Sequence, residues 1–405
     1  MSNTKQDMRI FELRFVDTVA RRGLYKPRNP LLLLVSGGSD SVALAYLVAR
    51  CFYAHAQNPC ALLHINHCLR GNDSDNDQHF VEGLAQFLGI PLFVRTIDVA
   101  CMARESKGNV EALAREARYG AAHEVLHDWC AKQGFNARTG RILVAHTQND
   151  RAEGFLMKAI QGFGPGGLQS LDYERVQKDR IVRPLLDMSR DDLRGYLYAL
   201  LEAGEAFRGD AGELWREDAT NAHTEYLRVF VRHNIVPLCI NRNPQFLTCL
   251  GRSLNLLAEE DSYMEDLTHA ALEQHVRFLW REDTQTGKEY AQPSMYACED
   301  LALAAEILPS ITGEHKALIR RVVLQVLGKL LGRDARIEAR SIEGIMDAFE
   351  CIDSEAQAGE PRAQRLKPKS GYVCNIQGNL AVSSNKRGVL IEPMERFRAR
   401  RKRRL

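Results

Sequence analysis

Six consecutive residues near the N-terminus have types and spacing that suit phosphate binding. They follow an aliphatic run at 31–35, precede a helical pattern, and are Ser36, Gly37, Gly38, Ser39, Asp40 and Ser41. A strand that runs through two glycines into a helix leaves several backbone N–H groups pointing out of one turn, at the positive end of the helix dipole. The glycines let the backbone approach an anion, and the serine hydroxyls add donors. We predict a phosphate cradle; a simple Ser/Gly helix cap is the alternative.

The acidic residue in this loop distinguishes it from other phosphate-binding loops. No G-x-x-x-x-G-K-[ST] motif occurs in the chain. Where that motif places a lysine against the phosphates, this loop has Asp40. A carboxylate beside a triphosphate makes sense mainly through a Mg²⁺ ion. The loop therefore predicts a bound nucleotide with Mg²⁺, and Asp40 as a metal ligand.

Four further groups of polar residues could serve a site. They are His64 with Asn66; Glu111, Arg115 and Arg118; His146, Asn149, Asp150 and Glu153; and Arg228 with Arg232. The first and third groups follow predicted strands, where α/β sheets bind ligands, and the second lies on one helical face. The fourth makes a basic face suited to RNA phosphates. Structural roles stay open for each: a buried histidine for the first group, an exposed ion-paired stripe for the second, a helix cap at Asp150 for the third, and surface ion pairs for Arg228 and Arg232.

The elements that must position these residues alternate along the first two hundred positions. Expected strands are 31–35, 61–66, 91–99, 142–145 and 181–183, and expected helices are 41–56, 73–88, 109–132, 151–161 and one beginning at 189. This alternation predicts an α/β fold with a doubly wound parallel sheet. The carboxyl ends of its strands would bring the loop and the polar groups to one edge.

The pattern changes after residue 244. A helical stripe from Phe246 to Leu279 keeps its period for more than thirty residues. Two helices at 315–331 and 337–349 and short strands at 372–376, 380–382 and 389–391 are expected after it. We predict three domains: the nucleotide-binding domain at 1–225, a helical domain at 226–310 and a small helical or α+β module at 311–405.

Composition excludes several classes of protein. The 405 residues include ten cysteines but no C-x-x-C pair, which argues against a zinc ribbon, a clustered iron–sulfur site or a redox dithiol. Scattered thiols suit a reducing cytoplasm, and no apolar run is long enough to span a membrane. The net charge of +2 hides a basic end: residues 396–405 carry seven basic side chains, either as a solvated tail or as an arm that binds a polyanion. The pattern does not choose between monomer and dimer.

Several segments together resemble one enzyme family. In order and spacing, the stretch from about 30 to 245 is similar to the tRNA(Ile)-lysidine synthases of the N-type ATP pyrophosphatase (PP-loop) superfamily. The segments are 36–41, 64–71, 108–119, 145–153, 162–168, 183–190, 215–221 and 226–237. The resemblance implies an adenine nucleotide alpha hydrolase-like fold. It also implies a ligase that adenylates the wobble cytidine of tRNA(Ile) with anticodon CAU, splits ATP into AMP and pyrophosphate, and attaches L-lysine to form lysidine.

The same resemblance implies roles for particular residues. Asp40, Glu111 and Glu153 would be catalytic; the loop, His64, Asn66 and His146 would hold the nucleotide; and the residues toward tRNA or lysine would be Arg70, Arg115, Arg118, Asn149, Asp150, Arg228 and Arg232. The domains after 225 would bind the tRNA body. Three alternatives stay open: a PP-loop tRNA 2-thiolase, a small-molecule synthetase that splits ATP to pyrophosphate, and a non-catalytic RNA-binding protein.

Overall fold

The chain forms two compact units. A computed structural model describes residues 3–55, 57–66, 72–98, 110–169, 171–175, 180–217, 226–279, 302–332, 335, 337–352 and 365–402. The units are residues 1–258 and 259–405, so the division falls inside one long helix, α12 (Phe246–His275). The three-domain boundaries expected from the sequence stay a prediction.

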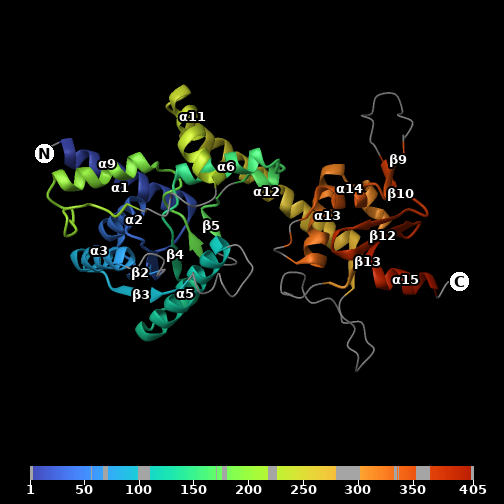
Figure 1. The fold of residues 1–405 in the computed structure, drawn as a ribbon, viewed down its shortest axis with the longest axis horizontal. Helices are drawn as coiled ribbons and strands as arrows, with labels where there is room; N and C mark the ends of the chain where they lie inside the picture. Colours follow the sequence, from blue (N-terminus) through green and yellow to red (C-terminus); the bar gives the residue numbers. More distant parts are fainter. Residues whose placement is uncertain are drawn as a thin grey trace. The chain divides into compact units, whose positions relative to one another are not determined.

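In the first unit, helices and strands alternate along the chain (Figure 1). In order, they are α1 (Asn3–Arg22), β1 (Leu31–Leu34), α2 (Ser39–Val48), a π-helical turn η1 (Ala49–Tyr53), β2 (Cys60–Asn66), α3 (Asn72–Leu88), β3 (Leu92–Thr96), α5 (Val110–Gln133), a 3₁₀ turn η2 (Ala137–Thr139), β4 (Arg141–Leu143), α6 (Gln148–Ile160), α7 (Pro165–Leu168), β5 (Glu174–Arg175), β6 (Ile181–Val182), α9 (Arg190–Glu202), α10 (Tyr226–Phe230), a π-helical turn η4 (Val231–Ile235), α11 (Val236–Arg242) and the beginning of α12. The sheet order is β3-β2-β1-β4-β6-β5. Every pairing is parallel except that of β5 with β6, so the predicted parallel α/β fold is confirmed.

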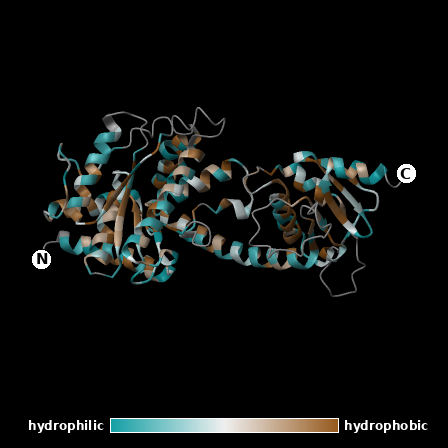
Figure 2. Cartoon of the chain, turned by 90° about the horizontal axis from the view of Figure 1, so that it is seen from below, coloured by the Kyte–Doolittle hydropathy of each residue, from teal (hydrophilic) through white to brown (hydrophobic). Residues whose placement is uncertain are grey.

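The central strand β1 shows why the sequence folds this way. All four of its leucines are buried, because alternate side chains point to opposite faces and both faces are covered. Leu31 and Leu33 pack in one core with residues of α1, α2, α3 and α9, whereas Leu32 and Leu34 pack in a second core with residues of α5. Figure 2 shows the apolar strands lying between helices whose outer faces are hydrophilic. The loop after β1 is thus held on a rigid element.

The helical stripe predicted from Phe246 to Leu279 is wrong over its last four residues. Helix α12 ends at His275, and Val276–Leu279 forms a strand, β7. Val276 and Phe278 are buried while Arg277 between them is exposed, which is the period of a strand. The strand pairs antiparallel with β8 (Ala304–Ile307).

The second unit is a sheet with helices. Its remaining elements are a 3₁₀ turn η5 (Pro309–Gly313), α13 (Lys316–Leu331), α14 (Ala339–Met346), β9 (Phe349–Ile352), β10 (Arg365–Pro368), β11 (Val373–Ile376), a 3₁₀ turn η6 (Gln377–Asn379), β12 (Leu380–Asn385), β13 (Gly388–Pro393) and α15 (Met394–Lys402). The sheet order is β11-β12-β13-β8-β7, and β9 pairs with β10. The two helices and three strands expected after residue 311 are confirmed, with β9 beginning where the second helix was expected to continue. Among the residues that the structure describes, no helix is long and apolar enough to cross a membrane.

Candidate active site

The loop predicted to bind phosphate joins β1 to α2. Gly37 has a φ of +94°, in the left-handed region that favours glycine, and its carbonyl accepts a hydrogen bond from the Arg216 N–H at 2.9 Å. A Cβ at Gly37 would lie 3.4 Å from Cγ of Arg216, so the segment after α9 packs directly against the loop. Gly38 is extended and precedes the first turn of α2. This glycine pair therefore sets both the turn and its contact with Arg216.

The three serine hydroxyls shape the loop from within. Ser41 Oγ donates to the Gly38 carbonyl at 2.9 Å and lies 3.3 Å from Ser36 Oγ, while Ser39 Oγ donates to Asp40 Oδ1 at 3.3 Å. The first N–H groups of a helix have no partner within the helix, and they carry the positive end of its dipole. The turn at the start of α2 is therefore suited to an anion, as the sequence predicted.

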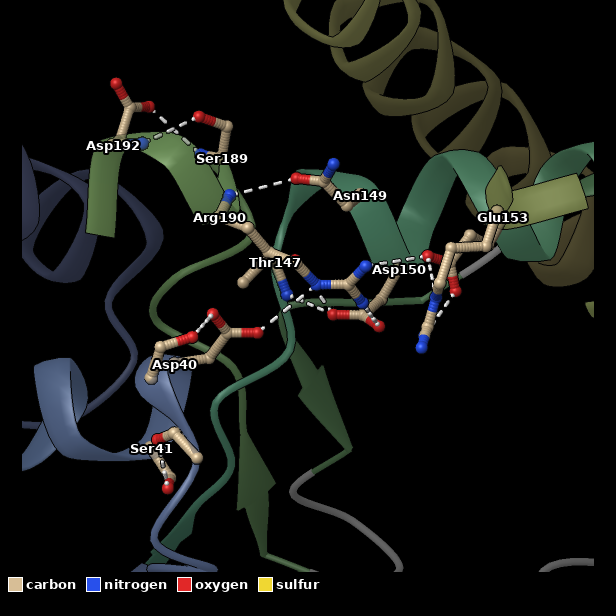
Figure 3. Close-up of polar contacts among 12 residues, drawn as sticks. Asp40, Ser41, Thr147, Asn149, Asp150, Glu153, Ser189, Arg190 and Asp192 are labelled. Atoms are coloured by element: carbon tan, nitrogen blue, oxygen red, sulfur yellow. Dashed lines mark hydrogen bonds and ion pairs between the residues drawn. The ribbon is translucent and has the colours of Figure 1, made fainter. Parts of the chain in front are cut away.

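One arginine that the sequence reasoning missed connects the loop to the other acidic residues. The Arg190 guanidinium lies 3.4 Å from Asp40 Oδ2, 2.7 Å from Asp150 Oδ1 and 2.9 Å from Glu153 Oε1 (Figure 3). Its backbone N–H donates to Asn149 Oδ1 at 3.0 Å. The sequence held no local signal for this role, because the first turn of α9 has its own acids, Asp191 and Asp192, and the partners of Arg190 lie 37 to 150 residues earlier in the chain.

Asp150 combines a capping role with an ion pair. Its Oδ2 accepts from the Thr147 N–H at 2.8 Å and from Thr147 Oγ1 at 2.9 Å, which caps α6, and its Oδ1 faces Arg190. Burial alone would raise the pKa of Asp150, but Arg190 and the hydrogen bonds from Thr147 outweigh it and lower the pKa to about 2. The predicted helix cap is present, and the carboxylate is ionised.

Glu153 lies one turn farther along α6, among three arginines. Arg232 donates to it from Nε at 2.8 Å and from Nη2 at 2.9 Å, Arg228 donates at 3.3 Å, and Arg190 donates at 2.9 Å. Only 1% of the Glu153 side chain is exposed. Burial raises its pKa, but the guanidiniums dominate and lower it. Arg228 and Arg232, two of the arginines expected to contact tRNA, therefore pair with Glu153 in this structure.

At Asp40, unlike Asp150 and Glu153, the effect of burial on the pKa outweighs the effect of the neighbouring cation. Burial raises the pKa of Asp40 to about 6, and the negative charge of Asp150 adds to this effect, whereas Arg190 and Ser39 oppose it. The carboxyl group thus titrates near neutral pH, unlike the two acids of α6. A divalent cation would favour its charged form.

The polar residues at the other strand ends are held by neighbours. His64 is buried, and its Nδ1 donates to the Val35 carbonyl at 2.9 Å. His146 Nδ1 accepts from Arg183 Nε at 3.1 Å. Burial lowers the pKa of both imidazoles, that of His146 to about 4, so both are neutral at pH 7. Asn66 donates to Asp75 and Gln78 of α3 at 3.3 and 3.2 Å.

The structure describes the remaining predicted site residues only in part. Arg70 is outside the described residues, and Glu111 belongs to the first turn of α5 with its side chain not described. Arg115 is exposed on α5, with its guanidinium over the Tyr119 ring at 5.3 Å from the ring centroid. Its charge contributes to lowering the pKa of His146, whereas Arg118 lies one turn farther along α5. The catalytic and binding roles assigned to these residues stay predictions.

In the described part of the chain, the protein side chains do not form a complete metal site by themselves. The described residues hold no group of three or more His, Cys, Asp or Glu side chains placed to bind one ion. A Mg²⁺ ion carried by a nucleotide needs only one or two carboxylates, because phosphates and water supply the other oxygens. Asp40, in the first turn of α2, fits that requirement.

The chain is similar in sequence to known proteins. Three of these relatives, each named tRNA(Ile)-lysidine synthase, are as follows. The protein of Thermus thermophilus is 38% identical over 254 residues, covering 62% of this chain and 44% of its own length. That of Geobacter sulfurreducens is 30% identical over 75% of this chain and 61% of its own, and that of Dehalococcoides mccartyi is 28% identical over 82% and 63%. The chain thus spans between 44% and 63% of the length of these relatives.

A family model matches more than half of the chain. It covers residues 9–239, from α1 to α11, and so includes the loop, the acids of α6 and the arginines that pair with them. On this match, the chain belongs to the PP-loop domain family.

Proposed function

We propose that this protein attaches L-lysine to the wobble cytidine of a tRNA(Ile) with the anticodon CAU, using ATP. In the first step, the carbonyl oxygen of the base attacks the α-phosphorus and pyrophosphate leaves. In the second, the ε-amine of lysine attacks the ring carbon of the adenylated base and AMP leaves. The lysidine formed would pair with A instead of G, so that the tRNA reads AUA instead of AUG.

One observation carries this proposal. The range matched by the PP-loop family model includes the loop, the start of α6 and the arginines of α10 and η4, and these lie close together at one edge of the sheet. Relatives named tRNA(Ile)-lysidine synthase are similar to 62% to 82% of this chain. The matched segments are thus spatially linked by Arg190, although Asp40 and Arg190 are 150 residues apart.

The loop is proposed to hold the nucleotide. Its N–H groups at the start of α2 would bind phosphate oxygens, with neutral His64 and His146 and the amide of Asn66 toward the rest of the nucleotide. Asp40 would hold Mg²⁺, which when bound supplies positive charge to the departing pyrophosphate. The carbonyl oxygen must also be positioned in line with the leaving group, which is a task for the domains that hold the tRNA.

The lowered pKa values of Asp150 and Glu153 limit which carboxylate could accept the proton of the lysine amine. The lysine amine must lose a proton before it attacks, and a good acceptor has a pKa near the working pH. Glu153, with three guanidinium partners and a lowered pKa, suits holding positive charge more than accepting a proton. We propose that Asp150 and Glu153 hold cationic groups. Because Asp40 is assigned to Mg²⁺, Glu111 remains as the candidate acceptor of the proton.

The test is an assay of purified protein with tRNA transcripts, ATP–Mg²⁺ and radiolabelled lysine. Incorporation of lysine into the CAU transcript but not into a transcript with a changed wobble base is expected. Asp40→Asn should lose most activity, whereas Asp17→Asn, which alters an exposed acid paired with Arg21 on α1, should keep it. Undiminished modification by Asp40→Asn would remove the catalytic role of the loop. In a parallel reaction supplied with a labelled sulfur donor, incorporation of sulfur into tRNA would select a 2-thiolase. Absence of turnover would refute the proposal.

A further inference from the structure

The outer side of helix α1 carries exposed apolar residues on successive turns. Ile10, Leu13 and Val16 are 50%, 52% and 37% exposed. Single exposed apolar residues are common on protein surfaces, but these three recur along one side of one helix. The buried residues Met8 and Phe15 lie on the opposite side of α1 and pack in the main core. The exposed residues therefore point away from the core that holds α1 in place.

The residues on this side of α1 are arranged symmetrically about Leu13. At 100° per residue, seven exposed residues lie within about 60° of the direction of Leu13 around the helix. These seven, here called the Leu13 face, are Gln6, Arg9, Ile10, Leu13, Val16, Asp17 and Ala20. Every member before Leu13 has a counterpart at the same distance after it. Arg9 thus corresponds to Asp17, and Ile10 corresponds to Val16.

This symmetry makes the Leu13 face complementary to itself. When two copies of α1 pair antiparallel about a two-fold axis at Leu13, each residue comes level with its counterpart on the other copy. Arg9 of each copy then lies beside Asp17 of the other, and the two leucines meet on the axis. A parallel pair would instead bring Arg9 beside Arg9 and Asp17 beside Asp17. Repulsion between like charges disfavours that arrangement, so the charges select the antiparallel one.

Both charged residues are accessible to a second copy. The Arg9 side chain is 69% exposed and lies 3.8 Å from Glu12, and the Asp17 side chain is 58% exposed and lies 2.6 Å from Arg21. Exposed ion pairs within one helix contribute little to stability. Arg9 and Asp17 can therefore exchange these partners for each other across two copies at little cost.

We propose that the Leu13 face is the contact surface of a homodimer, in which α1 pairs antiparallel with α1 of a second copy. The face is about 21 Å long, because its ends are 14 residues apart at 1.5 Å per residue. Such a small surface belongs with the weak interfaces, so the dimer forms at high protein concentration. The residues assigned to the active site all come from one chain, and catalysis does not require the dimer. The inference is thus independent of the proposed function.

Sedimentation velocity of the full-length chain over a series of concentrations, up to several hundred micromolar, measures the association. Leu13→Lys should raise the Kd of the dimer at least about tenfold, because the substitution places two like charges together on the axis. Asp7→Arg is the matched control. Asp7 is exposed on the same helix but lies about 120° around it from Leu13, so this variant should associate as the wild type does.

A pair of charge reversals tests the orientation of the two helices. Arg9→Asp alone and Asp17→Arg alone each bring like charges together at both ends of the contact, so each variant should associate at least about tenfold more weakly than the wild type. An equimolar mixture of the two variants should regain the association. In that heterodimer, opposite charges meet at both ends. A fluorescent label on one variant identifies the mixed species.

The results decide between the alternatives. A dimer that Leu13→Lys and the single reversals weaken, and that the mixture restores, supports the proposal. A chain that is monomeric at every concentration overturns it and leaves the Leu13 face to a different partner. A dimer that none of these variants weakens overturns it as well, because the contact then lies elsewhere. Single reversals that weaken the dimer without recovery in the mixture refute the antiparallel pairing. Thermal unfolding of each variant, followed in parallel, should give the wild-type Tm, because the substituted side chains are exposed.

Discussion

Replacing Arg190 by methionine should destabilise the first unit strongly at neutral pH. The variant keeps most of the side-chain volume but leaves Asp40, Asp150 and Glu153 without their shared cation. Removing one partner of a buried ion pair costs about 3–5 kcal/mol. In the wild type, the pKa of Asp150 is about 2 instead of 3.8, which corresponds to about 2.5 kcal/mol of stability present above pH 4 and lost as the pH falls from 4 to 2. Much of that contribution should disappear with Arg190.

The pH dependence gives this prediction its sign. The pKa of Asp40 is about 6, above its ordinary 3.8, so its ionisation opposes folding as the pH rises from 4 to 6. Without Arg190 this penalty grows, and protonation relieves it. We expect the Tm of Arg190→Met to fall by about 6–20 °C at pH 7.5, at about 2–4 °C per kcal/mol, and the deficit to shrink at pH 5.

The measurement is thermal unfolding by circular dichroism at both pH values. Arg21→Met is the matched control, because Arg21 pairs with Asp17 at 2.6 Å on the exposed face of α1, where such a pair is worth less than about 1 kcal/mol. A fall in Tm no larger than that of the control at pH 7.5 would refute the electrostatic account. So would a deficit that grows at pH 5.

Three other predictions concern the loop and its neighbours. Gly37→Ala should weaken ATP binding at least tenfold in calorimetry, because alanine is strained at a φ of +94° and the loop would have to change its conformation; Gly120→Ala, which meets nothing within 4 Å, should bind ATP normally. The gain in ATP affinity on adding Mg²⁺ should diminish as the pH falls below 6, since Asp40 becomes protonated, and Asp40→Asn should show no such change between pH 5 and 7.5; a wild-type profile that is flat would contradict this. Glu153→Gln should lower the Tm by several degrees, because it leaves three guanidiniums without a carboxylate, and an unchanged Tm would show that they repel one another little.

Features with a local cause were predictable from the sequence. The four leucines of β1, a short apolar run bounded by turn residues, are typical of a strand covered on both faces, and the two glycines between a strand and a helix are a local signature of an anion-binding turn. The helix α9 begins after Ser189, a strong N-cap, as expected. In each case the signal lies within about ten residues, so neighbouring sequence alone determined the outcome.

Features that depend on distant partners were missed. Arg190 meets carboxylates 37 to 150 residues earlier in the chain, so no local pattern gives its role. The strand β7 continues the apolar pattern of α12, and only its pairing with β8 makes it a strand. The N-terminal helix α1, which packs Phe15 into the main core, was not expected because its polar residues leave only a weak stripe.

The ion pairs at this edge of the sheet affect how charged ligands can bind there. Three guanidiniums, those of Arg190, Arg228 and Arg232, face three carboxyl groups, those of Asp40, Asp150 and Glu153, so the cluster is close to neutral before any ligand arrives. A cation that binds Asp40, or an ammonium group that binds the acids of α6, must compete with arginine for the same oxygens. Each guanidinium displaced in this way becomes available to an anion. Under the proposed function, the cations brought by Mg²⁺ and lysine would thus free arginines for the phosphates of ATP and tRNA, and binding of the opposite charges at this edge would be coupled.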